Sequence, residues 1–328
     1  FALGVKSQVS RLSFEAMHLL LIRHGQSKNN VLEAEHGAGS EFNNKRSIDP
    51  PLSDLGVLQA ELLGKRLGAQ LRSSRKRLKL MCSSMTRALQ TIEPLAKELQ
   101  LPVTVHPDVH EVKGFYNTSG EGPVCGSGKQ AIERQFPGFD ASLIPDGQGP
   151  ETIAEAAARG SRLVKMLKSW AKSGHDEDIL VIASHNDFLS LLGRLLLVPS
   201  ADAAVDVAAT EPEQLFNESY WPMNNTGVSH FVLGLRPPAG AYQVDVYLLY
   251  WNRSDHMSEC QRSGVQLKNI GFTESAEWAR VGRGGSKRYH LFRECAVVHC
   301  HGFWKGVAAS GMAALVVLLL AMSPRRRP

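Results

Sequence analysis

Leu19-Leu20-Leu21-Ile22-Arg23-His24-Gly25-Gln26-Ser27 joins a short apolar run to a polar turn. The run predicts a buried strand of about six residues, because a strand covered on both faces has apolar side chains at consecutive positions. Gly25 allows the chain to turn sharply after it. Arg23 and His24 are therefore expected at the carboxyl end of a strand, where open α/β sheets bind their ligands. A cation beside an imidazole indicates a binding site for an anion that the imidazole can attack.

Strand and helix patterns alternate along the rest of the chain. Further strands are predicted at 78–82, 102–106, 178–183, 226–235 and 242–250. Helices are predicted over 53–71, 83–99, 151–172 and 188–198, whereas 27–51 is interpreted as a loop with one short helix. Ser53 is a candidate N-cap, and Ser83-Ser84 is expected to cap the second helix. This alternation predicts a three-layer α/β/α sandwich with a mostly parallel central sheet.

The composition narrows the class of protein. The 328 residues have a formal net charge of +5, which fits an anionic substrate and does not require nucleic acid as a partner. Five cysteines form no C-x-x-C pair, so a reducing compartment is favoured over a disulfide framework. Residues 1–16 begin with Phe and are interpreted as a truncated N-terminal extension. No oligomeric state is predicted.

One catalytic domain is predicted over 17–255. Within it, the Gly-, Pro- and Ser-rich stretch at about 114–149 is expected to be an inserted loop or small subdomain over the site. Residues 256–305 are interpreted as a linker and tail. Residues 306–323 carry no charge, and as a helix they would span ~27 Å against a hydrocarbon core of ~30 Å.

Residues 306–323 are therefore interpreted as a C-terminal transmembrane anchor, with Arg325-Arg326-Arg327 at the interface. This interpretation places the catalytic domain in the cytoplasm, tail-anchored to an intracellular membrane. The alternative is an apolar helix packed on the domain, since several Gly and Ala residues weaken the hydrophobicity of its first half.

Two more basic side chains follow strands. Arg87 falls in the first turn of the helix after the second strand, and His185 directly follows the strand at 178–183. In a parallel sheet such junctions meet at one edge, so both should approach Arg23 and His24. This set suits a phosphoryl group, because guanidinium groups bind phosphate oxygens through paired, charge-assisted hydrogen bonds. Helix N-termini add to the same field.

These motifs, taken in order, resemble the histidine phosphatase superfamily, the phosphoglycerate-mutase-like proteins. The matching segments are 21–27 with Asn30, 52–56 with Gln59-Ala60, 83–88 with Gln90-Thr91, Glu111, Glu151 with Arg159, and 182–185. They cover roughly 17–250 with the spacing usual in the family. Several ordered motifs make a chance match improbable, whereas an isolated Arg-His-Gly would be weak.

The resemblance implies a phosphomonoesterase that needs no metal or other cofactor. His24 would attack phosphorus and become a phosphohistidine. Glu111 would protonate the leaving oxygen and then deprotonate the hydrolytic water. His185 would assist His24 by opposing the charge of the transition state. The phosphate-binding residues that the resemblance implies are Arg23, Asn30, Arg87 and His185.

Other functions remain open. A phosphoglycerate-mutase-type phosphotransferase is one alternative, although mutases of the family carry an Arg-rich segment after the acid and 112–117 has no arginine. A catalytically inactive phosphate-binding module is the other. It is favoured only by Asn186-Asp187, because an acidic residue near bound phosphate is unfavourable unless it points away or is paired.

The substrate is a phosphorylated small molecule or protein that the sequence does not identify further. A second anionic group could contact any of three cations, which otherwise face water: Lys113, Lys129 and Arg134. Four metal-ligating residues near the C-terminus match no common zinc spacing, so no metal site is expected there. They are Cys295, His299, Cys300 and His301.

Overall fold

The structure is a computed structural model that describes residues 16–37, 39–116, 126–173, 178–197, 221–235, 244–264 and 298–299. The strands in these residues are β1 Ala16–Arg23, β2 Arg77–Cys82, β3 Val103–Val105, β4 Phe139–Asp140, β5 Asp178–Ser184, β6 Val228–Leu235, β7 Val244–Arg253 and β8 Val298–His299. The helices are α2 Lys28–His36, α3 Ser40–Lys45, α4 Asp54–Ser73, α5 Thr86–Leu99, α6 Lys129–Gln135, α7 Ile153–Lys172 and α8 Asn186–Leu197. Two short 3₁₀ turns are η1 Pro107–Val109 and η2 Glu259–Gln261.

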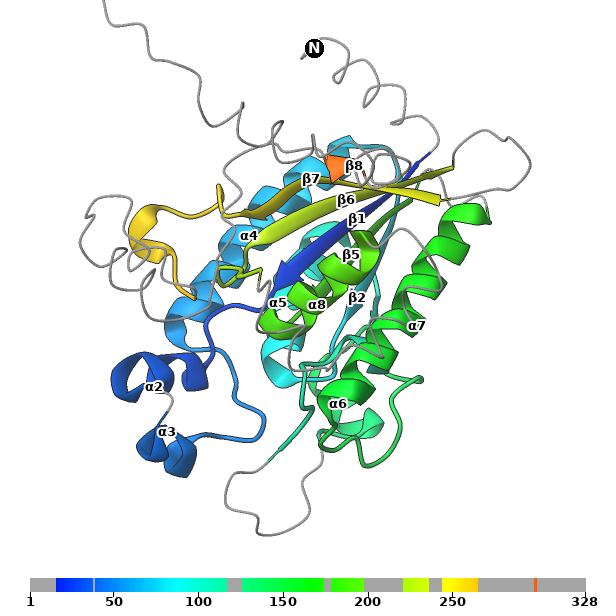
Figure 1. The fold of residues 1–328 in the computed structure, drawn as a ribbon. Helices are drawn as coiled ribbons and strands as arrows, with labels where there is room; N and C mark the ends of the chain where they lie inside the picture. Colours follow the sequence, from blue (N-terminus) through cyan, green and yellow to red (C-terminus); the bar gives the residue numbers. More distant parts are fainter. Residues whose placement is uncertain are drawn as a thin grey trace, which may run out of the picture.

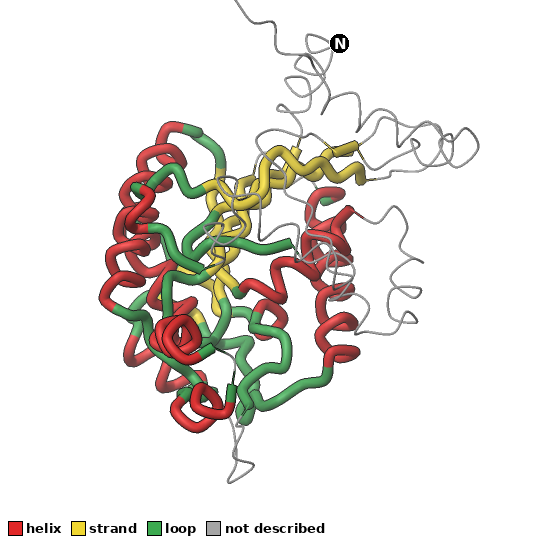
Figure 2. The backbone as a smooth tube through the Cα atoms, turned by 60° about the vertical axis from the view of Figure 1, so that its left-hand side comes forward, coloured by secondary structure: helices red, strands yellow, loops and turns green. Residues whose placement is uncertain are grey.

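The described strands form one sheet in the order β4-β3-β2-β5-β1-β6-β7-β8. Neighbours from β4 to β1 run parallel, and β6, β7 and β8 extend the sheet antiparallel beyond β1. Helices cover both faces of this sheet (Figures 1 and 2). The predicted three-layer α/β/α sandwich with a mostly parallel central sheet is therefore confirmed.

The opening apolar run lies at the centre of both cores. Leu19 and Leu21 pack against the side of α7 and α8, whereas Leu20 and Ile22 pack against the side of α4 and α5. Successive residues of a strand point to opposite faces, so a strand between two helical layers buries every side chain. The carboxyl end of β1 therefore lies in the middle of the sheet, beside the carboxyl end of β5.

One region differs from the prediction. The stretch at 27–51 holds two helices, α2 and α3, and α2 begins with a capping box between Ser27 and Asn30. The segment at 114–149, expected to be an inserted loop or small subdomain, contains α6 and β4, and β4 pairs with β3. Phe136 and Phe139 pack in the same core as Leu20, so this part of the segment completes the sheet edge.

The region after β7 also contacts the domain. Ser263 Oγ donates to Asn225 Oδ1 at 3.0 Å, and Gln59 Nε2 donates to the Gln261 carbonyl at 2.7 Å. Residues 256–264, assigned above to the tail, thus pack against the segment before β6 and against α4. The division into domains is otherwise untested and stays a prediction.

Several predictions fall on other parts of the chain. The extension before residue 16, the anchor at 306–323 and Cys295, Cys300 and His301 lie outside the described residues. In the part of the chain that the structure describes, no helix is long and apolar enough to cross a membrane. That part also contains no cluster of three or more potential metal ligands.

Gly56 provides a test of the packing around the turn after β1. A Cβ atom at Gly56 would lie 2.0 Å from the Gln26 carbonyl oxygen, so the Gly56→Ala side chain must displace the turn. We expect the free energy of unfolding to fall by about 2–3 kcal/mol in urea denaturation, although alanine favours helix more than glycine does.

Gly39→Ala is the matched control, because no atom lies within 4 Å of a Cβ at this N-cap position. Its effect should stay below about 1 kcal/mol. Equal stability of Gly56→Ala and wild type would contradict the close approach of Gly56 to the turn.

Candidate active site

His24 directly follows β1 and is buried. Its backbone N–H donates to the Ser184 carbonyl at 2.9 Å, which ties the ends of β1 and β5 together. Its ring Nδ1 lies 2.6 Å from the Gly25 carbonyl oxygen. Because a carbonyl only accepts, this contact assigns the proton to Nδ1 and the lone pair to Nε2. The Arg87 Nε group donates to Nε2 at 3.3 Å, so this ring nitrogen faces a guanidinium.

The charge state of His24 suits a nucleophile. Burial, followed by the charges of Arg87 and Arg23, holds the pKa of His24 well below its usual 6.5. The ring therefore stays neutral at physiological pH and keeps on Nε2 the lone pair that a nucleophile needs.

The two arginines are held by different parts of the chain. Arg23 Nη1 donates to the Met223 carbonyl, in the segment before β6. Its Nε is buried and has no hydrogen-bond partner among the described residues. Arg87 lies in the first turn of α5, with Nη1 3.8 Å from an oxygen of Asp49. The predicted convergence of Arg23, His24 and Arg87 is observed.

The cap of α5 differs from the prediction. Asp49 supplies it, accepting the Thr86 N–H at 2.9 Å and the Thr86 hydroxyl at 2.7 Å. Ser83 does not cap the helix. Its hydroxyl lies 2.8 Å from His185 Nε2 and accepts from the Met85 N–H at 3.2 Å. Thus the expected capping serine positions His185, and a carboxylate from the preceding loop holds the start of the helix that carries Arg87.

His185 stands beside His24. It is fully buried, and the two ring centroids are 5.2 Å apart. Burial and then the charge of Arg87 lower the pKa of His185 well below 6.5. Its Nδ1 is buried without a hydrogen-bond partner in the described part of the chain. An unsatisfied buried nitrogen next to the nucleophile marks a place where a ligand atom can bind.

Glu111 follows η1, and its side chain reaches the start of α8. Its Oε1 accepts the backbone N–H groups of Val112 at 2.9 Å and Phe188 at 3.0 Å. Burial, followed by the negative charge of Asp187, raises the pKa of Glu111 to about 7, against the opposing effect of Arg87. Both protonation states are populated at neutral pH, as a group that alternates between acid and base requires.

Glu151 and Arg159 position the loop that carries Glu111. The buried Arg159 donates through Nη1 to the carbonyls of Asp108 at 2.8 Å and His110 at 3.0 Å, and through Nη2 to that of Glu111 at 3.4 Å. Its Nε donates to Glu151 at 3.0 Å. This pair of matched residues therefore acts on the backbone before and at the acid.

Asn30 is connected to the nucleophile through its amide oxygen. That oxygen accepts the Ser27 N–H at 3.1 Å in the capping box of α2 and lies 3.4 Å from Asn225 Nδ2. Asn225 Nδ2 also donates to the His24 carbonyl at 3.0 Å. These bonds use the oxygen of Asn30, which leaves its Nδ2 group as the part that would donate to a ligand.

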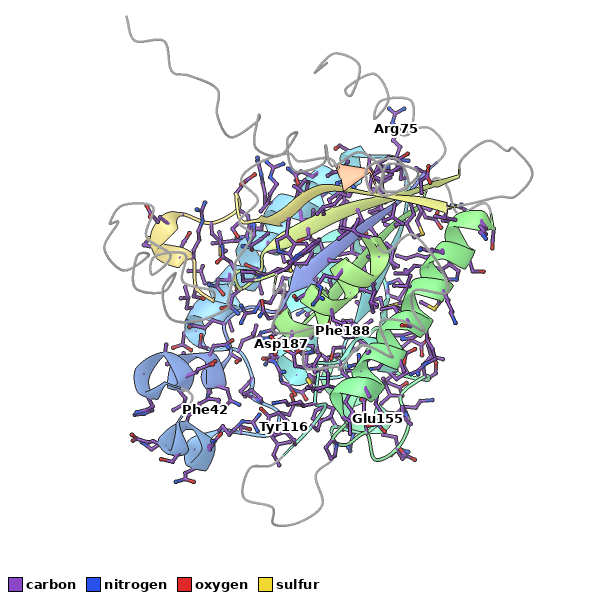
Figure 3. All side chains as sticks on the ribbon, in the orientation of Figure 1. Phe42, Arg75, Tyr116, Glu155, Asp187 and Phe188 are labelled. Atoms are coloured by element: carbon purple, nitrogen blue, oxygen red, sulfur yellow. The ribbon has the colours of Figure 1, made fainter. Side chains whose placement is uncertain are left out.

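Asp187 is less unfavourable than the sequence alone suggested. Asn186 Nδ2 donates to its carboxylate at 3.2 Å, and Asn186 Oδ1 accepts the Met223 N–H at 2.9 Å. Figure 3 shows Asp187 and Phe188 at the start of α8, on the side of the carboxyl end of β1. The carboxylate is therefore hydrogen-bonded, and its negative charge helps to keep Glu111 protonated.

Three site residues were not identified from the sequence: Asp49, Gln148 and Asn225. Gln148 belongs to the segment at 114–149 and links it to the site, since its Nε2 lies 2.9 Å from His110 Nδ1 and its Oε1 accepts from Ser84 at 2.5 Å. Asp49 had one signal, its place before Pro50-Pro51, but its partner Thr86 lies far along the chain.

Comparison with known proteins identifies a family. A family model described as the histidine phosphatase superfamily (branch 1) matches residues 19–209. No curated protein matches the chain.

Several solved structures are similar. A mycobacterial glucosyl-3-phosphoglycerate phosphatase in complex with VO3 is 22% identical, with 72% of this chain and 98% of that one covered and a TM-score of 0.41. A putative alpha-ribazole-5'-P phosphatase from Escherichia coli is 21% identical, with 73% of this chain and 98% of that one covered and a TM-score of 0.42. A phosphoserine phosphatase mutant from Entamoeba histolytica in complex with phosphoserine is 16% identical, with 74% of this chain and 100% of that one covered and a TM-score of 0.40.

The effect of the Asp187 charge on Glu111 leads to a prediction that does not depend on activity. Asp187→Asn removes a negative charge that raises the pKa of Glu111, so this pKa should fall below about 7. The measurement is an NMR titration of the Glu111 side-chain carboxyl carbon in both proteins. Glu61→Gln, on the exposed side of α4, serves as control and should leave the midpoint in place. An unchanged midpoint in Asp187→Asn would refute the assignment.

Proposed function

The chain belongs to the histidine phosphatase superfamily, and we propose that it is a phosphomonoesterase that acts through a phosphohistidine at His24. The observation that carries this proposal is the neutral His24 ring, with its proton on Nδ1 and its Nε2 facing Arg87. A buried imidazole in this state can attack phosphorus without first losing a proton.

In the first proposed step, the Nε2 lone pair of His24 forms a bond to phosphorus while the bond from phosphorus to the leaving oxygen breaks. The Glu111 carboxyl group gives its proton to that oxygen. Arg23, Arg87 and the Nδ1 side of His185 would bind the phosphoryl oxygens as negative charge spreads over them. The hydrogen bond from Nδ1 to the Gly25 carbonyl stabilises the positive charge that the ring gains.

In the second step, water attacks the phosphohistidine. The Glu111 carboxylate takes a proton from this water as the new oxygen–phosphorus bond forms and the nitrogen–phosphorus bond breaks. His24 returns to its neutral state with the proton still on Nδ1, and Glu111 is protonated again. The cycle hydrolyses one phosphate ester per turnover, and none of its steps involves a metal ion.

Hydrolysis is favoured over the two alternatives by different observations. The segment at 112–117 has no arginine, which speaks against a mutase-type phosphotransferase. The set Arg23, His24, Arg87 and His185 is complete and convergent, and Asp187 is hydrogen-bonded, which speaks against an inactive binding module.

Removal of the nucleophile tests the proposal. His24→Ala should lower phosphate release from p-nitrophenyl phosphate, and from a panel of phosphorylated metabolites, at least about a thousandfold, because the covalent route is lost. In parallel, acid-labile phosphoenzyme should accumulate on rapid quenching of wild type but not of His24→Ala.

His36→Ala, at the exposed end of α2, is the matched control and should retain full turnover. Turnover that survives in His24→Ala would exclude the phosphohistidine. A wild-type chain that binds inorganic phosphate but hydrolyses no ester would establish the binding module instead.

The acid role of Glu111 predicts the pH dependence. The first step needs protonated Glu111, so kcat for an alkyl phosphate should fall about tenfold per pH unit above pH 7, the pKa of this carboxyl group. The low pKa of His24 predicts no corresponding loss near pH 6. Glu111→Gln should lower kcat about 10²- to 10⁴-fold and remove the alkaline limb. A limb that persists in this variant would assign the acid to another group.

A further inference from the structure

A third arginine stands near the two that face His24. Arg46 directly follows α3, and its guanidinium carbon lies 3.9 Å from the centroid of the Tyr116 ring and 5.9 Å from that of Phe42. Its Nη1 donates to the Tyr116 carbonyl at 3.0 Å. Stacking and this hydrogen bond together hold the guanidinium in one orientation.

The charge of Arg46 is not neutralised in the way that other charges of the site are. Arg87 has Asp49 nearby, and Arg159 has Glu151. Among the described residues no carboxylate forms an ion pair with Arg46, and its buried Nε has no hydrogen-bond partner. A half-buried cation without a counter-charge is costly, and a bound anion removes part of that cost.

The charge of Arg46 acts on Arg87, which donates to His24. The charges of Arg46 and Arg23 both disfavour a second positive charge at Arg87 and so lower its pKa. By contrast, the arginines that lower the pKa of His24 are Arg87 and Arg23. Arg46 is three residues before Asp49, the carboxylate 3.8 Å from Arg87, so it stands near the site and can serve a group other than the reacting phosphoryl group. In the view of Figure 3, Phe42 and Tyr116 lie farther from β1 than Asp187 does.

We propose that Arg46, Tyr116 and Phe42 form a subsite for a second anionic group of the substrate, a carboxylate or a phosphate, separated from the phosphorus that His24 attacks. This inference rests on the proposed phosphatase activity and narrows its substrate class. A guanidinium fixed against an aromatic ring offers its remaining N–H groups to anionic oxygens, and charge-assisted bonds of this kind are strong.

The subsite also changes the interpretation of two sequence features. The segment at 112–117 has no arginine of its own, but its Tyr116 contacts Arg46, which follows α3 and is 70 positions away in the sequence. Arg134, a candidate for the second anionic group, is exposed and donates within its own helix to the Gln130 carbonyl at 3.2 Å. The structure thus favours Arg46 over Arg134 for this role.

Two substrates that differ in one group test the subsite. Glycerol 3-phosphate and 3-phosphoglycerate differ in a hydroxymethyl group against a carboxylate, and 1,3-propanediol bisphosphate tests a second phosphate. For wild type we expect kcat/KM to be about ten- to hundredfold higher for whichever of the two anion-bearing substrates fits. Arg46→Met should abolish this preference and leave kcat/KM for glycerol 3-phosphate within about threefold of wild type.

Arg66→Met, on the exposed face of α4, is the matched control and should keep the preference. No preference in wild type, or an equal loss for all three substrates in Arg46→Met, overturns the subsite. An equal loss is the result expected if Arg46 only supports the fold.

Ligand binding tests the subsite separately from the proposed phosphatase activity. If wild type hydrolyses no ester, including p-nitrophenyl phosphate, the phosphatase proposal fails, and calorimetric titration of the same three ligands decides the subsite. A tenfold or greater loss of affinity for the anion-bearing ligands in Arg46→Met, with unchanged affinity for glycerol 3-phosphate, supports it. Equal binding of all three ligands to wild type, or none, overturns it.

Discussion

The hydrogen bond between His24 Nδ1 and the Gly25 carbonyl is the interaction on which the chemistry of the site depends. It decides which ring nitrogen carries the proton, and it requires the chain to turn directly after β1. Gly25 makes this possible, since a Cβ atom there would lie 2.7 Å from the Gly56 carbonyl oxygen. Thr91 holds the turn from α5, because its hydroxyl accepts the Gly25 N–H at 2.9 Å. The position of α5 against the turn therefore fixes the tautomer of His24.

The charges around this turn are balanced and not uniformly positive. Arg23 and Arg87 bring positive charge to His24, yet carboxylates lie in the same region, and each has a local effect. Asp49 caps α5 and lies near Arg87, whereas Asp187 raises the pKa of Glu111. A site that must bind an anion and also donate a proton to it needs both signs, because arginines alone would hold the acid ionised.

The sequence predicted what depends on local pattern. The apolar run before Arg23 determined β1, and parallel topology then required Arg87 and His185 to meet His24 at one edge. The predictions that were wrong concern contacts between residues far apart in the sequence. The cap of α5 comes from Asp49, 37 positions before Thr86, and no local signal distinguishes it from the serines beside the helix. The polar helices α2 and α3 lack the apolar periodicity that reveals the others, so Arg46 could not be placed near Tyr116.

The contacts made by residues 261–264 have a consequence for how the protein is produced in a cell. Asn225, which donates to the His24 carbonyl, is itself hydrogen-bonded to Ser263 through both its side chain and its backbone. During synthesis, the ribosome therefore completes His24, Glu111 and His185 well before it adds the residues that brace the turn. A nascent chain at that stage carries these side chains without their final support, and the turn after β1 is braced only once the residues that follow β7 have been added.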